Sequence, residues 1–174
     1  MALTLEFAGM LLDQSLFSAL LDAAAQSPRR RAFKNLHQDF AEAVQRVVIA
    51  IQPDSYVPPH RHVEAHQWEL FVVLAGSIDF CQFDDAGQLT ARNTLVAGSA
   101  LTGLELAPGV WHSIIAASGG AVFLEVKQGP FDPAQPRFFA PFAPTEQDTE
   151  AGTYLAWLRT ALPGAQSPAW QEMK

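Results

Sequence analysis

Short apolar runs dominate the middle of the chain. Between Val44 and Gln128 they recur about every eight to twelve residues, separated by Gly, Pro and Asp, and no helical period connects them. The pattern predicts strands over residues 44–52, 56–62, 67–75, 77–83, 88–95, 99–106, 110–117 and 121–128. About eight strands would leave exposed edges in one open sheet, so closure into a barrel or a two-sheet sandwich is expected.

Helical periods flank this region. Residues 13–26 place Leu16, Phe17 and Leu20 on one face behind a predicted Asp13 N-cap, and residues 149–162 form a second amphipathic segment that ends before Pro163. Between them, residues 129–144 contain five prolines and several phenylalanines, which predicts a wrap around the barrel rather than a free linker. We therefore expect one domain over 1–174, with an N-terminal helical segment (1–43), a β-barrel (44–128), and the wrap with its C-terminal helix (129–174).

Composition and charge narrow the function classes. The 174 residues carry a formal net charge of -7, which repels phosphate backbones and anionic lipid, so neither nucleic acid nor membrane is an expected partner. Cys81 is the one cysteine, so no intrachain disulfide forms and a reducing compartment is expected. The N-terminus lacks a basic region ahead of an apolar run, which disfavours a signal peptide and favours a cytoplasmic location.

Histidine carries the candidate chemistry. His60 and His62 are two residues apart at the end of a predicted strand, so both imidazoles face the same side. Glu69 opens a strongly apolar strand, where a carboxylate needs a partner, and His112 follows a turn near the start of a later strand. Isolated histidines in strands are usually structural, but three imidazoles and a carboxylate at strand-compatible positions predict a metal site.

These residues resemble the motifs of the cupin superfamily. In the first motif, His60-Arg61-His62, Glu69 and Gly76 match in order, but six residues separate His62 from Glu69 where three or four are usual, so Gln67 competes as the ligand. We favour Glu69 because it keeps the spacing to Gly76 and carries charge. In the second motif His112 matches, whereas the proline is displaced and Ala116 replaces an expected asparagine. The resemblance implies an all-β fold with flanking helices, the cupin double-stranded β-helix or jelly-roll barrel.

A longer set of segments is similar to the WbuC family of cupin-fold metalloproteins. The similarity covers most of the chain and rests on residues 27–31, 35–37, 44–46, 56–62, 68–69, 83–85, 111–113 and 125–131. It implies a metal-binding jelly roll, often associated with bacterial surface-polysaccharide gene clusters, whose reaction is not established.

The expected cofactor is one divalent transition metal held by His60, His62, Glu69 and His112. Three imidazoles and one carboxylate suit Zn, Fe, Mn, Ni or Cu, and they leave coordination positions for water or substrate. The expected ligand is a small molecule, such as a sugar, a nucleotide-sugar or a related metabolite. An Fe(II) dioxygenase and a non-catalytic binding or regulatory module are the two alternatives.

Several further residues are candidates for the pocket. Glu125 and Lys127 share one face of the last strand, where Glu125 is the expected proton-transfer group, although a solvent-facing ion pair fits the sequence equally well. Substrate-binding candidates are Arg46, Lys127, Asn35, His37 and Gln67, with Arg61 as a further cation, whereas His66 is expected in a surface or gating role. The apolar face of Trp68, Leu70, Val72 and Leu74 is expected to pack on a helix or on a second subunit, which leaves a homodimer open.

Overall fold

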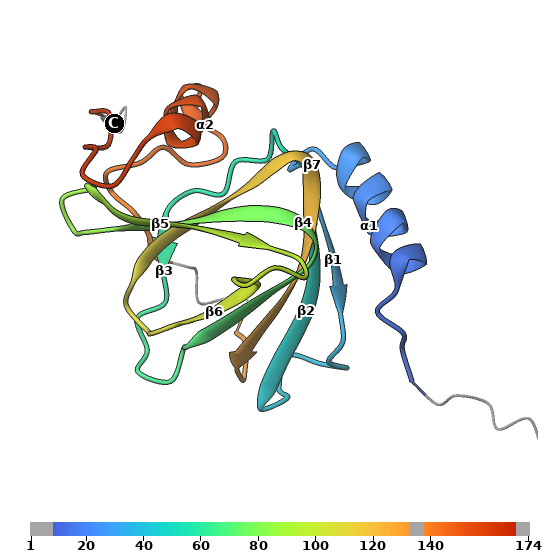
Figure 1. Cartoon of the computed structure of the whole chain (residues 1–174). Coiled ribbons are helices and arrows are strands. Elements are labelled where there is room, and N and C mark those ends of the chain that lie inside the picture. Colours follow the sequence, from blue (N-terminus) through green and yellow to red (C-terminus); the bar gives the residue numbers. More distant parts are fainter. Residues whose placement is uncertain (1–8, 133–137, 170–174) are drawn as a thin grey trace, which may run out of the picture.

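The computed structural model describes residues 9–132 and 138–169. Two helices and eight strands occur within these residues: α1 (Gln14–Gln26), β1 (Arg31–Asn35), β2 (Val44–Ile51), β3 (His60–Arg61), β4 (Glu69–Phe83), β5 (Leu89–Val96), β6 (Gly103–Leu106), β7 (Trp111–Gln128), β8 (Phe138–Phe139) and α2 (Ala151–Thr160). Figure 1 shows the strands curving around a common interior, with one helix at each side.

Strands β4 and β7 form a long antiparallel ribbon at the centre of the fold. The end of β7 pairs with β2 and with the start of β4, and the start of β4 also pairs with β6. The start of β7 pairs with β3 and with the end of β4, which pairs in turn with β5. All pairings are antiparallel, and apolar side chains from both halves fill one interior core. The predicted all-β barrel with flanking helices is thus confirmed.

The ribbon bends where the sequence predicted interruptions. The pairing of β4 with β7 shifts between Val73 and Ala75 and between Gly76 and Ile78. Gly76 has φ +72°, and a Cβ added there would lie 2.4 Å from the carbonyl oxygen of Gly120, so glycine permits this close approach. The strands predicted as 67–75 and 77–83, and as 110–117 and 121–128, are therefore halves of two bent strands.

Other expected strand boundaries were wrong for identifiable reasons. The segment 56–62 contributes only β3, because Pro58 and Pro59 have no N–H to donate to a ladder. The expected helical segment 1–43 contains strand β1, which pairs along β2 from Arg31 opposite Ile51 to Asn35 opposite Val47. This five-residue edge strand is rich in polar residues, so it gave no apolar run to detect. Residues 1–8 of that segment lie outside the described residues.

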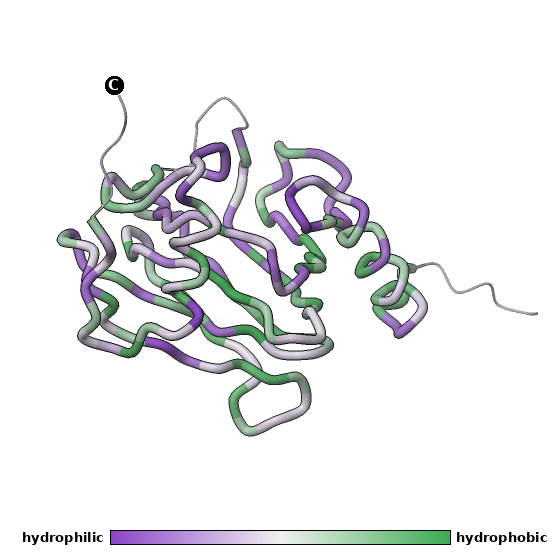
Figure 2. Tube along the Cα trace, turned by 90° about the horizontal axis from the view of Figure 1, so that it is seen from above, coloured by the Kyte–Doolittle hydropathy of each residue, from purple (hydrophilic) through white to green (hydrophobic). Residues whose placement is uncertain are grey.

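The two helices cover opposite outer faces of the barrel. The Asp13 side chain caps α1 by accepting from the Leu16 N–H at 3.0 Å, as predicted, and α1 packs with Phe17 and Leu20 on a group that includes Val48 and Val122. Helix α2 covers the other face in the same way, through a cluster that contains Leu158 and Cys81. Figure 2 shows hydrophobic residues recurring along the central strands and hydrophilic residues gathered in several peripheral loops. No helix within the described residues is long and apolar enough to cross a membrane.

The proline-rich segment lies along the barrel where it is described. Ala140 N–H donates to the Pro59 carbonyl at 2.9 Å, and the Tyr56 hydroxyl donates to the Pro144 carbonyl at 2.8 Å. Strand β8 pairs with β3, so this segment borders the candidate ligand histidines. Two of its five prolines, at positions 133 and 136, lie outside the described residues.

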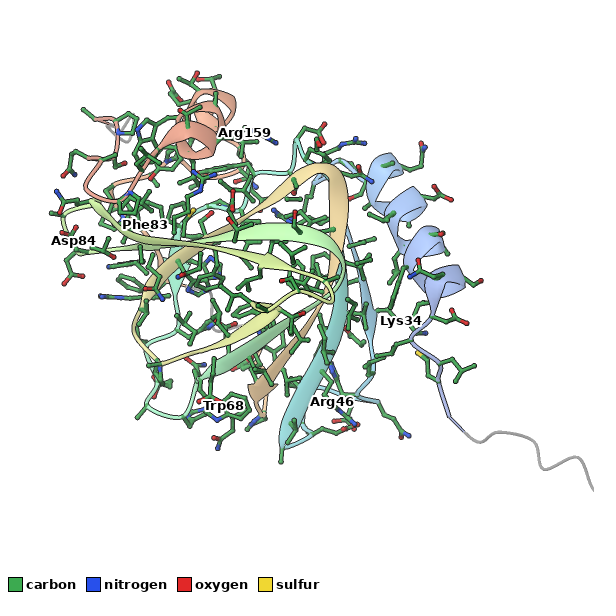
Figure 3. The ribbon with its side chains drawn as sticks, in the orientation of Figure 1. Lys34, Arg46, Trp68, Phe83, Asp84 and Arg159 are labelled. Carbon is green, nitrogen blue, oxygen red and sulfur yellow. The ribbon has the colours of Figure 1, made fainter. Side chains whose placement is uncertain are left out.

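The apolar face of β4 is only partly covered by α1. Leu74 packs against the cluster beneath α1, whereas Trp68, Leu70 and Val72 stay partly exposed. Figure 3 shows Trp68 at the end of the barrel where β4 begins. The helix thus accounts for one part of the predicted face, and a second subunit on the remainder stays a prediction.

Candidate metal centre and adjoining cavities

Three histidines gather around one buried carboxylate. His60 on β3 lies opposite His112 on β7 in the strand register, with ring centroids 4.4 Å apart. Glu69, at the start of β4, is 2% exposed, and its two oxygens lie 3.2 Å from His62 Nε2 and 3.3 Å from His112 Nε2. The structure therefore brings together His60, His62, Glu69 and His112 from three strands and a loop.

Gln67, the competing residue, lies elsewhere. It sits in the loop between β3 and β4, and its Oε1 accepts from the Glu64 N–H at 3.2 Å. The extra residues between His62 and Glu69 form this loop. The additional length therefore does not displace Glu69, which still faces the histidines. Gln67 lines the cavity beside them.

Backbone carbonyls fix the tautomers of two histidines. His60 Nδ1 lies 2.9 Å from the Pro58 carbonyl oxygen, and His112 Nδ1 lies 3.0 Å from that of Val110. Because a carbonyl oxygen only accepts, each Nδ1 carries a proton, and in the neutral ring Nε2 keeps its lone pair. This is the tautomer that binds a metal through Nε2 with a carbonyl at the other nitrogen.

Electrostatics support a charged Glu69 carboxylate beside the imidazoles. Burial alone would raise the pKa of Glu69, but the close His62 imidazole, His112 and Lys127 outweigh it and lower that pKa to about 2. Burial lowers the pKa of His112, although the Glu69 charge opposes this effect. The Phe80 ring stacks on His112 at 5.4 Å between centroids and 10° between planes, which fixes the orientation of the imidazole.

The donor set fits a divalent metal, but its present arrangement is not a coordination sphere. Within the described ranges, no three His, Cys, Asp or Glu side chains are grouped so that they could hold a metal ion as they stand. The Glu69 carboxylate contacts both Nε2 atoms itself, and His62 Nε2 is buried without a hydrogen bond to any described residue. Metal binding would therefore require these side chains to exchange their His–Glu contacts for bonds to the ion.

A cavity of about 500 Å³ adjoins this cluster. Its wall combines polar, charged and aromatic side chains from the loop after β3, the end of β7 and the proline-rich segment: Arg61, His62, Val63, Glu64, His66, Gln67, Lys127, Gln128, Pro130, Phe131, Asp132 and Phe138. Arg61 is held by Asp85 at 3.1 Å and lies over the Trp111 ring at 4.2 Å from its centroid. Exposed His66 lies on the wall, a position compatible with the predicted surface or gating role.

Glu125 and Lys127 connect this cavity to the carboxylate of the cluster. Lys127 Nζ lies 3.0 Å from Glu125 Oε1 and 4.0 Å from Glu69 Oε1. Both side chains are mostly buried on the inner face of β7, so the alternative of a solvent-facing ion pair is wrong. Strand alternation identified the shared face, but only the barrel curvature decides that this face looks inward.

A second cavity, of about 190 Å³, shares Lys127 and Phe131 with the first. Asn35 and His37 line it, together with Glu125 and residues of β1 and β2. Arg46 lines neither cavity: its guanidinium pairs with Glu42, and Figure 3 shows it at the lower end of β2. Sequence reasoning missed Phe33 and Phe40 on the cavity wall, for which the only signal was aromatic residues in a polar segment.

Comparisons with known proteins give limited matches. A family model described as a domain of unknown function, DUF6016, matches residues 12–95. No curated protein matches the sequence. The resemblance to the WbuC family stays a prediction, because none of these matches tests it.

Similar solved structures include oxalate decarboxylase from Bacillus subtilis. A structure from a study of its Mn(II) centres is 20% identical, with a TM-score of 0.48 and coverage of 63% of this chain and 27% of that one. A mutant of the same enzyme is 22% identical, with a TM-score of 0.48 and coverage of 64% and 28%. A conserved Streptococcus pyogenes protein of unknown function is 12% identical, with a TM-score of 0.45 and coverage of 61% and 80%. With TM-scores below 0.5, these similarities transfer no activity to this chain.

Proposed function

We propose that this protein is a cupin-type metalloprotein that binds one divalent transition metal through His60, His62, Glu69 and His112 and acts on a small oxygen-rich metabolite. The observation that carries the proposal is a cluster of three imidazoles, two of which contact a buried carboxylate, beside a cavity of about 500 Å³. A bound metal of this class would polarise a carbonyl or hydroxyl oxygen of the substrate.

The remaining residues of the cavity have separate roles in this proposal. Lys127 supplies a positive charge for an anionic or hydroxyl oxygen of the substrate, and Glu125, 3.0 Å from its ammonium, accepts or returns a proton. Gln67 and Arg61, which also line this cavity, offer further hydrogen-bond donors. The WbuC resemblance adds carbohydrate-like substrates as the class to test first.

Metal content is the direct test. Purified protein is dialysed against a chelator, reloaded with Mn, Fe, Ni or Zn, desalted and analysed by mass spectrometry for metal per chain. We expect about one ion in the wild type, and close to none in His60→Ala and His62→Ala, because losing one ligand of four opens the site.

His66→Ala is the matched control. It removes an imidazole from the same loop region and cavity wall, but the His66 side chain is exposed and lies outside the ligand cluster. We expect full metal content in this variant. A wild-type protein that retains none of the four metals, or a His60→Ala, His62→Ala double variant that retains the ion, would contradict the proposed site.

A further inference from the structure

The cavity of about 190 Å³ has aromatic walls with no occupant among the described residues. Phe33 and Phe40 are 48% and 43% exposed, although both line the cavity, and Phe131 meets Phe40 edge to face at 5.2 Å between centroids. Gln45 holds this arrangement, because its amide donates to the carbonyls of Phe40 and Glu42 at 3.2 and 2.8 Å. Large apolar side chains left open on a concave surface are typical of a binding site for a ligand.

His37 adds one unused hydrogen-bond donor to these walls. His37 Nδ1 lies 2.9 Å from the Arg46 carbonyl oxygen and 3.0 Å from the Arg46 backbone nitrogen, and that carbonyl already accepts from the Leu36 N–H at 2.8 Å. Since this carbonyl already has a donor, whereas a backbone N–H can only donate, we assign Nδ1 as the acceptor of the Arg46 N–H, and the neutral ring then carries its proton on Nε2. His37 is 7% exposed, and its Nε2 has no hydrogen-bond partner in the described part of the chain.

The charges around the cavity disfavour a cationic occupant. Glu125 is the acidic group in the wall, and Lys127 already pairs with it at 3.0 Å. Lys127 Nζ also lies 5.3 Å from the centroid of the Phe131 ring, where a ligand cation would otherwise sit. A second positive charge would meet Lys127, whereas an uncharged acceptor would satisfy His37 Nε2.

We infer that this cavity is a subsite for a flat, uncharged group that carries a carbonyl acceptor, such as an aromatic amide or an acylated amine. The flat group packs between Phe33, Phe40 and Phe131, and its carbonyl accepts from His37 Nε2. Because Lys127 and Phe131 also line the larger cavity, the group is one end of a ligand whose oxygen-rich end faces the metal centre. In that respect the subsite rests on the proposed function.

Acetanilide is the probe for this subsite, since it combines a phenyl ring with one carbonyl. Its binding is measured by titration monitored by NMR of 15N-labelled protein, with and without chelator. We expect Phe40→Ala, Phe131→Ala and His37→Phe each to weaken binding about fivefold, through lost ring contact or a lost hydrogen bond. His37→Gln keeps an N–H donor and is expected to restore most of the affinity.

Phe138→Ala is the matched control. Phe138 is an exposed phenylalanine of the larger cavity that does not line the smaller one, so its loss is expected to leave acetanilide binding unchanged. Unchanged binding in both Phe40→Ala and Phe131→Ala would overturn the subsite, even if the His37 variants fail to fold. Tighter binding of benzyltrimethylammonium than of acetanilide would overturn its preference for an uncharged group.

The two proposals fail in different measurements. Acetanilide binding by a protein that retains no metal after reloading and desalting would support the subsite while contradicting the metal site. Normal metal content without acetanilide binding would support the metal site while contradicting the subsite, because no proposed metal ligand lines the smaller cavity.

Discussion

Strands β4 and β7 run through both halves of the barrel, yet they place very different residues at its centre and at its open end. Near the bend, their inward side chains are apolar and almost fully buried, as with Ile78, Phe80 and Phe123. Toward the open end, the same inward face of the same strands carries Glu69, Glu125 and Lys127. Figure 1 shows the start of β4 and the end of β7 together at the lower end of the barrel.

The two regions have different roles: the apolar centre stabilises the fold, whereas the charged open end serves binding and chemistry. Apolar side chains at the centre stabilise the barrel through buried area and close packing. Buried charges at the open end lose hydration, and their pairing does little more than offset that loss. Hydrophobic residues of similar size would serve stability as well there, so the polar end is best explained by binding and chemistry.

The largest expected effect is at the apolar centre. Phe80→Ala removes a fully buried ring that packs against Phe71 and His112, and we expect the free energy of unfolding in urea to fall by about 3–5 kcal/mol. Val63→Ala, at an exposed position of the cavity rim, is expected to change it by less than about 0.5 kcal/mol. Equal losses in the two variants would show that the centre is not the main source of stability.

A smaller effect is expected from the ion pair at the open end. Glu125→Gln and Lys127→Met each leave a mostly buried charge without its partner, and we expect each to lower the free energy of unfolding by roughly 1–3 kcal/mol at pH 7. The double variant is expected to lie closer to the wild type than the sum of the two losses. Strict additivity in this double-mutant cycle would mean that the two groups do not interact.

The smallest effect concerns an ion pair outside the barrel interior. The Glu146 carboxylate accepts hydrogen bonds from Arg29 at 2.7 and 2.9 Å and from buried Arg31. Burial alone would raise the pKa of Glu146, but the contacts with the two arginines outweigh burial and lower that pKa. A lowered folded-state pKa adds stability above the unfolded pKa of about 4.3, and this stability is lost as the pH falls through the folded value. We expect Glu146→Gln to cost about 1 kcal/mol at pH 7, because Arg29 is half exposed and its contact is weakened by solvent.

The test compares wild type and Glu146→Gln in urea at pH 7 and at pH 3. We expect the difference in unfolding free energy between the two proteins to shrink at the lower pH. Glu105→Gln, at an exposed position on β6, is the control for removal of one carboxylate. A difference that stays constant or grows from pH 7 to pH 3 would contradict the assigned role of Glu146.

Much of the fold was predictable because local signals agree with it. The strand pattern, the two helices and the Asp13 cap depend on alternation, helical period and a side chain near its own backbone, which are all properties of neighbouring residues. Strand β1 was missed because its place is decided by pairing with β2 rather than by an apolar run of its own. The sequence pattern predicts two separate strands on either side of each bend in β4 and β7, because a glycine can mark either a bend within a strand or the end of a strand.

The candidate centre divides in the same way. The sequence by itself determined which residue types were available: two histidines on one strand face, a carboxylate in an apolar strand and a third histidine after a turn. Only the tertiary structure decided that His112 lies opposite His60, that Glu69 rather than Gln67 faces the histidines, and that His37 comes beside Lys127 in a second cavity. The reason is physical: alternation fixes the side of a strand to which a residue points, whereas pairing between distant strands and curvature of the barrel fix what lies on that side.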